Sequence, residues 1–287
     1  MRVRSFAKIN LGLEVIRKRP DNYHDLRTLF QCVDFYDTLE FIPKTHGRIV
    51  LKGNNPRIPW DEQNLIYLAA ELLKERFSVS FGIEIHVDKK IPVGGGLGGG
   101  SSNAAMTLHS LNTIWDLKCS KEELVDIGRT LGADVPYFFE GGLCVGQGKG
   151  DELTRLEDLD PFYCVLVFPE LSIITASAYH RLSLLTSEGK DSKIIRFLDN
   201  LEYGSLENSL EETVFNLHPQ LRDIKRLFYK LESELSLVSG SGSTVFGIFH
   251  QRKKALDVCE RLKNTYSLSL TKSLSRAQYW DRINVGV

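Results

Sequence analysis

A glycine-rich stretch between a predicted strand and a predicted helix restricts the fold of this chain more than any other feature. Residues 91–105 read IPVGGGLGGGSSNAA, with six glycines in seven positions. Each glycine adds an entropic cost of ordering that a side chain would spare. Strict apolar–polar alternation predicts a half-buried strand over 82–88, and apolar residues at helical spacing predict a helix over 101–115. The stretch therefore connects a strand directly to a helix.

This order of elements favours an anion-binding loop over a flexible linker. Bare amides that lead into a helix N-terminus attract anions, because the helix dipole adds partial positive charge there. Gly94-x-Gly96-x-x-Gly99 matches the dinucleotide-binding pattern, but no second strand with an acidic residue follows about 20 residues on. A Walker A loop needs Gly-Lys-Ser or Gly-Lys-Thr, whereas Gly148-Lys149 is followed by glycine. With the dinucleotide-binding and Walker A patterns disfavoured, a phosphate-binding loop of a third kind remains.

Composition excludes several classes of protein. The 287 residues are 42% hydrophobic and 25% charged, with a formal net charge of -1, which is ordinary for a soluble globular protein. There is no basic excess to indicate nucleic acid, and no apolar run approaches the roughly 18 residues of a membrane span. Five widely spaced cysteines without a C-x-x-C pair fit reduced thiols, and Cys144 and Cys164 lie in apolar runs typical of a core. With no signal-like start, we expect a cytoplasmic protein.

The order of predicted elements indicates an α+β fold in two parts. The first 16 residues read as a strand, and residues 61–77 as an amphipathic helix. A capping box of Ser120 and Glu123 begins a helix that should end at Gly132. In the second half, Pro219 occupies a first helical position, and residues 251–266 form the last expected helix. Because helices and strands do not alternate strictly, a doubly wound sheet is disfavoured. The expected boundary at 158–161 gives domains of residues 1–158 and 159–287.

Motifs along most of the chain resemble one family. The segment PVGGGLGGGSSNAA is similar to the phosphate loop of the GHMP kinases. Within that superfamily, AKINLGL (7–13), RPDNYHDLRTLFQ (19–31), QNLI (63–66), LGADVPYF (131–138) and SGSGSTVF (239–246) resemble the 4-diphosphocytidyl-2-C-methyl-D-erythritol kinases and occur in the same order. The resemblance implies an N-terminal ribosomal S5-like domain and a C-terminal ferredoxin-like domain, with the active site in the cleft between them.

The same resemblance implies a reaction and its cofactors. ATP would phosphorylate the 2-hydroxyl of 4-diphosphocytidyl-2-C-methyl-D-erythritol, a small-molecule substrate of the non-mevalonate isoprenoid pathway. Mg²⁺ is expected because it bridges the ATP phosphates, with Ser101 or Ser102 as candidate protein ligands. The implied ATP-binding residues are Pro92, Val93, Gly94, Gly95, Gly96, Leu97, Gly98, Gly99, Gly100, Ser101 and Ser102.

Three polar residues are candidates for the chemistry of phosphoryl transfer. Asp134 follows the helix stop at Gly132 between apolar neighbours, and local sequence alone leaves a turn aspartate and a catalytic one equally open. Lys8 interrupts an apolar strand, where it would either pair with a buried carboxylate or protect a sheet edge. The resemblance implies that Asp134 is the base facing the acceptor alcohol and that Lys8 lies beside it. Asn10, on the same strand face as Lys8, looks like a substrate-binding residue.

Aromatic residues are candidates for recognising the cytosine base. The resemblance implies that Tyr23 stacks on the base, that His24 bonds its edge and that Phe30 belongs to the same pocket. In the second half, it implies that Thr175 contacts substrate and that Tyr179 covers the opposite face of the base. Asn22 stands where the family usually has glycine, and asparagine tolerates the left-handed turn expected there.

Other functions are weighed against this one. A kinase of the same superfamily that acts on homoserine, mevalonate or a sugar would not need the aromatic pair. A nucleotide-binding protein without activity would not need both Lys8 and Asp134. The chain has no H-E-x-x-H motif, no zinc-like Cys/His spacing and no G-x-S-x-G elbow. The charged turn at 149–152 is expected to be solvated, and the sequence does not give an oligomeric state.

Overall fold

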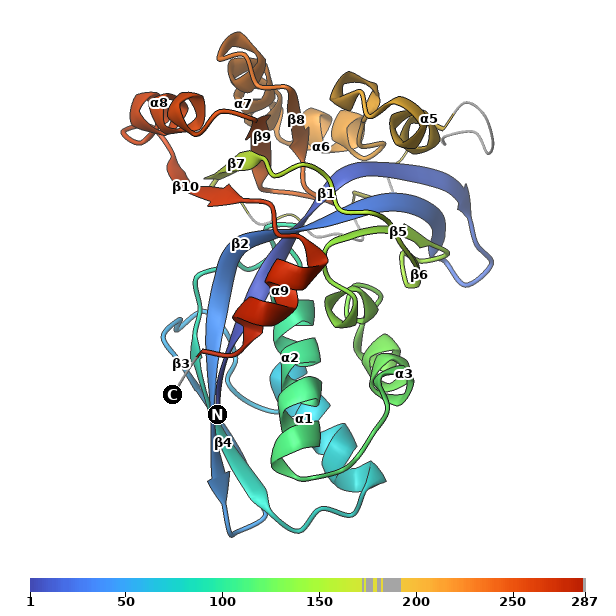
Figure 1. Ribbon diagram of the computed structural model, residues 1–287, viewed down its shortest axis with the longest axis vertical. Coiled ribbons are helices and arrows are strands. Elements are labelled where there is room, and N and C mark those ends of the chain that lie inside the picture. Colours follow the sequence, from blue (N-terminus) through green and yellow to red (C-terminus); the bar gives the residue numbers. More distant parts are fainter. Residues whose placement is uncertain (172, 174–177, 180–181, 183–191, 286–287) are drawn as a thin grey trace.

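The computed structural model describes residues 1–285, except 172, 174–177, 180–181 and 183–191 (Figure 1). Its strands are β1 (Arg2–Lys18), β2 (His24–Lys44), β3 (Ile49–Gly53), β4 (Gly82–Asp88), β5 (Leu143–Gln147), β6 (Glu152–Arg155), β7 (Tyr163–Phe168), β8 (Leu235–Val238), β9 (Val245–Phe249) and β10 (Ser267–Lys272). Its α-helices are α1 (Leu65–Arg76), α2 (Gly99–Ile114), α3 (Lys121–Leu131), α5 (Lys193–Asn200), α6 (Glu211–Leu217), α7 (Pro219–Lys230), α8 (Arg252–Leu262) and α9 (Arg276–Ile283). Short 3-10 turns are η1 (Pro136–Phe139) and η2 (Tyr203–Ser205).

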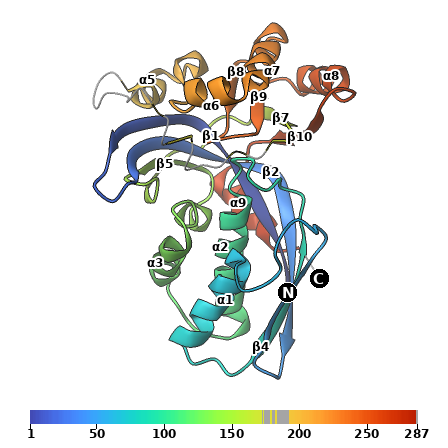
Figure 2. The same cartoon turned by 180° about the vertical axis from the view of Figure 1, so that it is seen from behind.

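The first sheet is built around β2. This long strand pairs with β1 along one edge, and with β4 and then β5 along the other, giving the order β3-β4-β2-β5-β6 with β1 beside β2. Helices α1, α2 and α3 cover one face of the sheet (Figures 1 and 2). The apolar faces of β2, β4, α1 and α2 share one core cluster. The isoleucines and the valine of the alternating segment 82–88 lie in this cluster.

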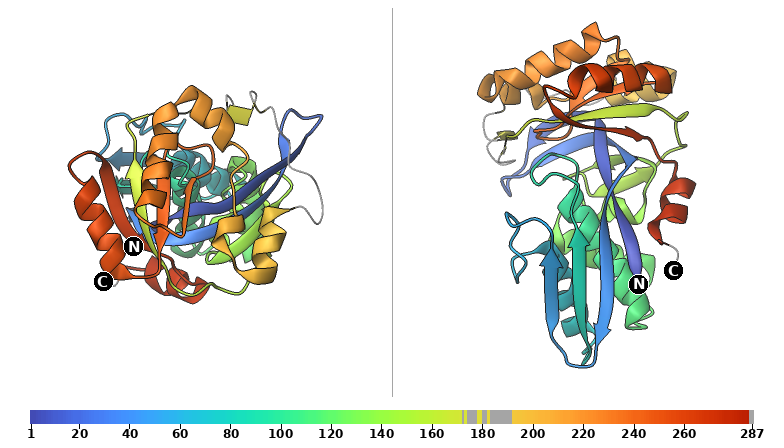
Figure 3. Two further views of the ribbon diagram at one scale, coloured as in Figure 1. Left: turned by 90° about the horizontal axis from the view of Figure 1, so that it is seen from above. Right: turned by 90° about the vertical axis from the view of Figure 1, so that its left-hand side faces the viewer.

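The second sheet has the order β10-β7-β9-β8, and all its pairings are antiparallel. Helices α7 and α8 contact these strands on the side away from the first sheet (Figure 3). The opposite face packs on the upper part of β1 and β2, so that Ile9 and Leu29 share a core cluster with Leu166 and Phe246. The two sheets therefore meet through the middle of the β1–β2 hairpin.

Most of the predicted elements form as the sequence suggests. Strand β4 covers 82–88 as predicted, and α3 begins after Ser120 with both halves of its capping box formed. Helix α1 begins at Leu65 rather than at 61, because the Asn64 side chain caps it by accepting from the amide of Ile66. Helix α7 begins at Pro219, and the glycine-rich segment before residue 245 enters β9.

The expectation that residues 251–266 form the last helix is wrong. After α8 and β10, Ser275 and Gln278 form a second capping box that begins α9. This helix returns to the first sheet, where Tyr279 is buried and its hydroxyl donates to the Phe138 carbonyl at 2.6 Å. The following backbone bridges to β1, with the Val285 amide 3.1 Å from the Arg2 carbonyl oxygen. The boundary predicted at 158–161 lies between β6 and β7 and stays a prediction.

The five cysteines are free thiols, and Cys144 and Cys164 are core residues as predicted. Burial raises the pKa of the Cys144 thiol to about 11, so it stays protonated at neutral pH. Among the described residues, no helix combines the length and the hydropathy needed to cross a membrane.

Candidate active site

A cavity of about 530 Å³ opens where the two sheets meet. Its lining residues come from β1, β2, the glycine loop, the turn between α3 and η1, and a second glycine-rich loop before β9. The predicted site residues that line it are Lys8, Asn10, Tyr23, His24, Phe30, Gly94, Gly96, Gly98, Ser101, Asp134 and Tyr179. Residues predicted from segments far apart in the sequence thus share one space.

Lys8 and Asp134 form an ion pair at this cavity. The Lys8 side chain comes from the middle of β1 and the residue is only 3% exposed, so its ammonium needs polar partners. Its Nζ donates to Asn10 Oδ1 at 2.6 Å and lies 3.4 Å from Asp134 Oδ2. It also lies 5.3 Å from the centre of the Phe30 ring. The backbone of Lys8 is fixed to the glycine loop, because its amide donates to the Leu97 carbonyl at 3.0 Å.

Asp134 reaches the cavity because the chain turns sharply between α3 and η1. Helix α3 ends at Leu131 with Gly132 as its C-cap, and η1 begins at Pro136 after three further residues. The Asp134 side chain remains 35% exposed, in contrast to its lysine partner. A carboxylate that faces open space beside an ammonium is able to accept a hydrogen bond from an alcohol in the cavity, while the ammonium offsets nearby negative charge.

Asn10 is held by a residue that the sequence analysis did not select. Its Nδ2 donates to Thr28 Oγ1 at 2.7 Å, and Thr28 in turn donates to the Gly12 carbonyl at 2.9 Å. These bonds orient the Asn10 amide so that its oxygen faces Lys8. A single threonine in a strand carries no sequence signal for this role, because the contact depends on how β1 and β2 pair.

The glycine loop packs backbone against backbone on the second glycine-rich loop. The Ser239 hydroxyl donates to the Gly96 carbonyl at 2.9 Å, and the Thr244 amide donates to the Gly95 carbonyl at 3.2 Å. A Cβ on Gly96 would lie 1.9 Å from the Ser239 carbonyl oxygen. Gly98 caps α2 in the left-handed region at φ 68°, with no side-chain cap. Both glycines are therefore required by geometry as well as by flexibility.

A second cavity of about 360 Å³ lies on the other side of the same loop. The two cavities share Gly94, Gly96, Gly98 and Ser101. The remaining predicted loop residues that line the second one are Pro92, Val93, Gly95, Leu97, Gly99 and Gly100, and it continues over Trp60 and Lys89. The loop thus borders two cavities that share part of its backbone, and together they offer room for a base and for a chain of phosphates.

An arm of the main cavity is lined by aromatic rings. The rings of His24 and Tyr179 stack with centroids 5.3 Å apart and planes 27° apart. Tyr23 is 57% exposed, and Lys149 Nζ lies 4.0 Å from the centre of its ring. Burial raises the pKa of the Tyr179 phenol, with Asp134 adding to the shift, so this ring stays neutral. Asn22 has φ 65°, the left-handed turn expected of it.

Lys149, expected as part of a solvated charged turn, has a side chain that is 33% exposed, and it also lines the cavity over Tyr23 and pairs with Asp21 at 3.1 Å. Its Gly-Lys-Gly context was the available signal, since glycines on both sides let a short turn approach the hairpin of β1 and β2. Thr175 lies outside the described residues.

Comparison with known proteins identifies the family. The model for the GHMP kinases N terminal domain matches residues 64–142, and that for GHMP kinases C terminal matches residues 192–268. A 4-diphosphocytidyl-2-C-methyl-D-erythritol kinase of Exiguobacterium sibiricum is 40% identical over 88% of this chain and 90% of its own length. The enzyme of the same name from Syntrophus aciditrophicus is 43% identical over 89% and 92%.

The chain belongs to the 4-diphosphocytidyl-2-C-methyl-D-erythritol kinase family of the GHMP kinases. A crystal structure of a 4-(cytidine 5'-diphospho)-2C-methyl-D-erythritol kinase is 33% identical and superposes with a TM-score of 0.83 over 95% of this chain and 99% of the other. A homoserine kinase from Cytophaga hutchinsonii, 18% identical with a TM-score of 0.76 over 96% and 94%, shares the fold. The predicted two-domain α+β fold of the GHMP kinases is confirmed, and the chain is an ATP-dependent small-molecule kinase.

Membership in a kinase family raises the question of where Mg²⁺ would bind. The described residues contain no group of three or more His, Cys, Asp or Glu side chains that could hold a metal. Ser102 is fully buried, and its hydroxyl oxygen accepts from Ser5 at 2.7 Å. Ser101 instead lines both cavities at the start of α2. This donor set fits a Mg²⁺ ion held mainly by nucleotide phosphates and water, with few protein ligands.

Replacing Gly96 by alanine should abolish nucleotide binding. The added Cβ would meet the Ser239 carbonyl oxygen and would be strained at φ 74°, so one of the two loops has to shift. Calorimetric titration with ATP measures the effect, and circular dichroism shows whether the variant is folded. Gly204→Ala is the matched control, because a Cβ there would meet nothing within 4 Å and Gly204 lines neither cavity. A folded Gly96→Ala variant with native affinity for ATP would contradict the packing argument.

Proposed function

We propose that this chain transfers the γ-phosphoryl group of ATP to the 2-hydroxyl of 4-diphosphocytidyl-2-C-methyl-D-erythritol. One observation carries the proposal: a single cavity joins the glycine loop, the Lys8–Asp134 pair and an arm lined by aromatic rings. The relatives at 40% and 43% identity bear the name of this activity and match the chain over most of their length.

ATP would lie along the glycine loop. The adenine and ribose fit the smaller cavity, where Trp60 and Lys89 line the wall, and the phosphates would follow the loop into the main cavity. The first amides of α2 and its dipole favour negative charge at that point. Mg²⁺ would neutralise the phosphate oxygens, with Ser101 as the protein ligand.

Asp134 and Lys8 would act on the acceptor hydroxyl. A substrate alcohol placed between the loop and Asp134 donates a hydrogen bond to the carboxylate, which holds or removes the proton while the oxygen attacks the γ-phosphorus. Lys8 lies close enough to Asp134 to orient it and to offset charge that develops on the oxygens. Asn10, fixed by Thr28, keeps the ammonium in place and presents its amide to the substrate.

The aromatic arm would select the cytidine end of the substrate. Tyr23 offers an exposed ring for stacking, the rings of His24 and Tyr179 stack on each other in the same cavity, and Phe30 lines it near Lys8. Stacking on exposed rings is worth about 1–3 kcal/mol per base. The Tyr179 ring already stacks on His24 in the structure. Thr175 remains a candidate substrate contact.

A test of substrate identity is ADP release with three acceptors. The native protein, ATP and Mg²⁺ should produce ADP rapidly with the cytidyl substrate and only at background rate with homoserine or mevalonate. The aromatic arm is the reason, because neither small acceptor has a base to occupy it. Rapid turnover with homoserine or mevalonate instead would support the alternative kinases. Binding of ATP without turnover of any acceptor would support a nucleotide-binding protein that lacks activity.

Asp134→Asn should lower kcat by at least about 10², the scale of general-base catalysis. The affinity for ATP should stay near native, because Asp134 lies on the acceptor side of the cavity, outside the residues that line the smaller cavity. Steady-state kinetics with the cytidyl substrate measure the change. Asp126→Asn, an exposed residue of α3, controls for charge removal nearby. A near-native kcat for Asp134→Asn would refute the assignment as base.

Tyr23→Ala should raise the KM for the cytidyl substrate about tenfold or more, which corresponds to the loss of one stacked base. The KM for ATP should change little, since Tyr23 is absent from the smaller cavity. Tyr229→Ala, an exposed tyrosine on α7, serves as the control. Equal changes in both KM values would argue against a cytosine site in this arm.

A further inference from the structure

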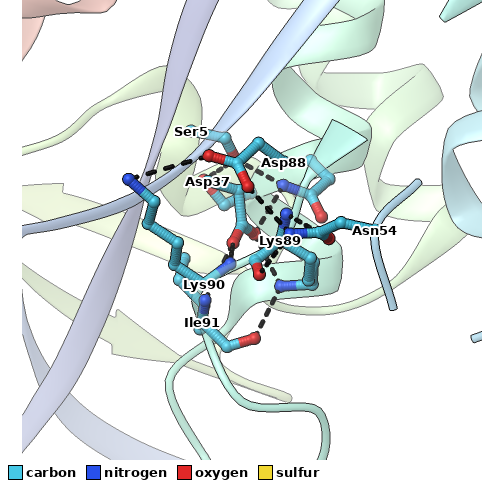
Figure 4. A network of polar contacts seen from close by, with 9 residues as sticks. Ser5, Asp37, Asn54, Asp88, Lys89, Lys90 and Ile91 are labelled. Atoms are coloured by element: carbon cyan, nitrogen blue, oxygen red, sulfur yellow. Dashed lines mark hydrogen bonds and ion pairs between the residues drawn. The ribbon is translucent and has the colours of Figure 1, made fainter. Parts of the chain in front are cut away.

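A buried carboxylate lies at the base of the glycine loop. Asp37 comes from β2 and pairs in register with Ser5 of β1, and both residues are fully buried. Asp37 Oδ1 accepts from the backbone amides of Lys90 at 2.7 Å and Ile91 at 2.8 Å. Its Oδ2 accepts from Lys89 Nζ at 2.6 Å and from Asn103 Nδ2 at 3.0 Å. Figure 4 shows Lys89, Lys90 and Ile91 gathered around Asp37.

These four donors flank the glycine loop on both sides. Residues 89–91 form the entry from β4 into the loop, and Asn103 lies in the first turns of α2, just after it. One side chain therefore fixes the chain before the loop and the chain after it. Entry and exit are tied at a point where the loop itself, rich in glycine, has few side chains to hold its shape.

The network continues into the start of α2. Asn103 Nδ2 also donates to Ser5 Oγ at 2.8 Å, and Ser5 donates to Ser102 Oγ at 2.7 Å. The Lys89 ammonium donates to the Ile91 carbonyl at 2.9 Å as well as to Asp37, which closes the entry segment on itself. Burial lowers the pKa of Lys89, and the nearby Asp37 carboxylate opposes that shift. The buried charges are thus paired and bonded on several sides.

A purely structural role is the alternative to consider. Many buried ion pairs only satisfy each other, and their removal lowers the free energy of unfolding without any selective effect on ligands. Because the Asp37–Lys89 pair lies beside the glycine loop, we expect its removal to affect ligand binding selectively. Its partners are the backbone immediately before Pro92 and the side chain next to Ser102, while the cavity arm that holds Tyr23 and His24 contacts none of them.

We propose that Asp37 is a positioning residue for the nucleotide, which holds both ends of the glycine loop so that its amides meet the ATP phosphates in a fixed geometry. The proposal rests on the assignment of ATP to this loop. It assigns Asp37 no contact with substrate, and places its effect on the affinity for ATP rather than on recognition of the acceptor. Ser5 transmits the same constraint to the first turn of α2.

The principal test is Asp37→Asn. The amide keeps the carbonyl oxygen that accepts from residues 90 and 91, but its nitrogen opposes two donors, Lys89 and Asn103. We expect the KM for ATP to rise about tenfold or more, as for other small misplacements of binding groups, and the KM for the cytidyl substrate to stay within about twofold. Glu14→Gln is the matched control, because Glu14 is fully buried and accepts from Ser192, the Ile194 amide and Arg27, away from the loop.

If Asp37→Asn does not fold, a milder variant tests the positioning role. Ser5→Ala removes one link of the network without leaving a charge unpaired, and should raise the dissociation constant for ATP about threefold. Its control is Ser110→Ala in α2, a buried serine whose hydroxyl has no partner within the described part of the chain. Both are measured by calorimetric titration with ATP and Mg²⁺ and no acceptor, so an error in the proposed acceptor would not affect the result.

Selective loss of ATP affinity in Asp37→Asn and Ser5→Ala, with Glu14→Gln and Ser110→Ala near native, would support the positioning role. A folded Asp37→Asn variant with native affinity for ATP would overturn it. The proposal would also be overturned if Asp37→Asn and Glu14→Gln each raised the KM for ATP and the KM for the cytidyl substrate by the same factor. That pattern indicates a general loss of structure. If Asp37→Asn is unfolded and Ser5→Ala binds ATP like the native protein, the proposal fails as well.

Discussion

Much of the structure around the active site follows from the burial of the Lys8 ammonium, because a buried charge requires polar partners. Leaving such a charge buried without partners costs about 3–5 kcal/mol, so its neighbours have to supply oxygen atoms. Asn10 provides one from the same strand, and Asp134 provides a carboxylate from the turn after α3. The amide of Lys8 is bonded to the glycine loop at Leu97, which connects the charge to the phosphate-binding side. Ion pair, loop and turn therefore depend on one another.

The glycine loops show why the site lies between the two sheets. A loop that presents bare amides on one side needs support from the other, and here that support is the backbone of residues 239–244. Because carbonyl oxygens approach Gly96 so closely, no larger residue fits without moving one loop. The buried network around Asp37 supports the same loop from the first sheet. Preorganised amides of this kind attract phosphate without reorganising during the reaction.

Local patterns in the sequence were enough to predict the elements on which the site is built. The alternation in 82–88, the capping box at Ser120 and the proline at 219 each act within a few residues, so a short window carries their signal. Helix α9 had such a signal, the Ser275–Gln278 capping box, but its apolar residues pack on a sheet formed much earlier in the chain. The role of Thr28 and the stacking of His24 on Tyr179 depend on contacts between segments far apart in the sequence, which no local pattern encodes.

Helix α9 also affects the order in which parts of the protein can fold during synthesis. Tyr279 and Ile283 belong to the apolar cluster of the first sheet, and the backbone at residues 284 and 285 bonds to the beginning of β1. During synthesis, β1 is made long before α9, so the edge of β1 at Arg2 and Val3 stays uncovered until residues 284 and 285 have followed. The apolar cluster to which β1 and β2 contribute is therefore completed only once α9, far along the chain, has been made.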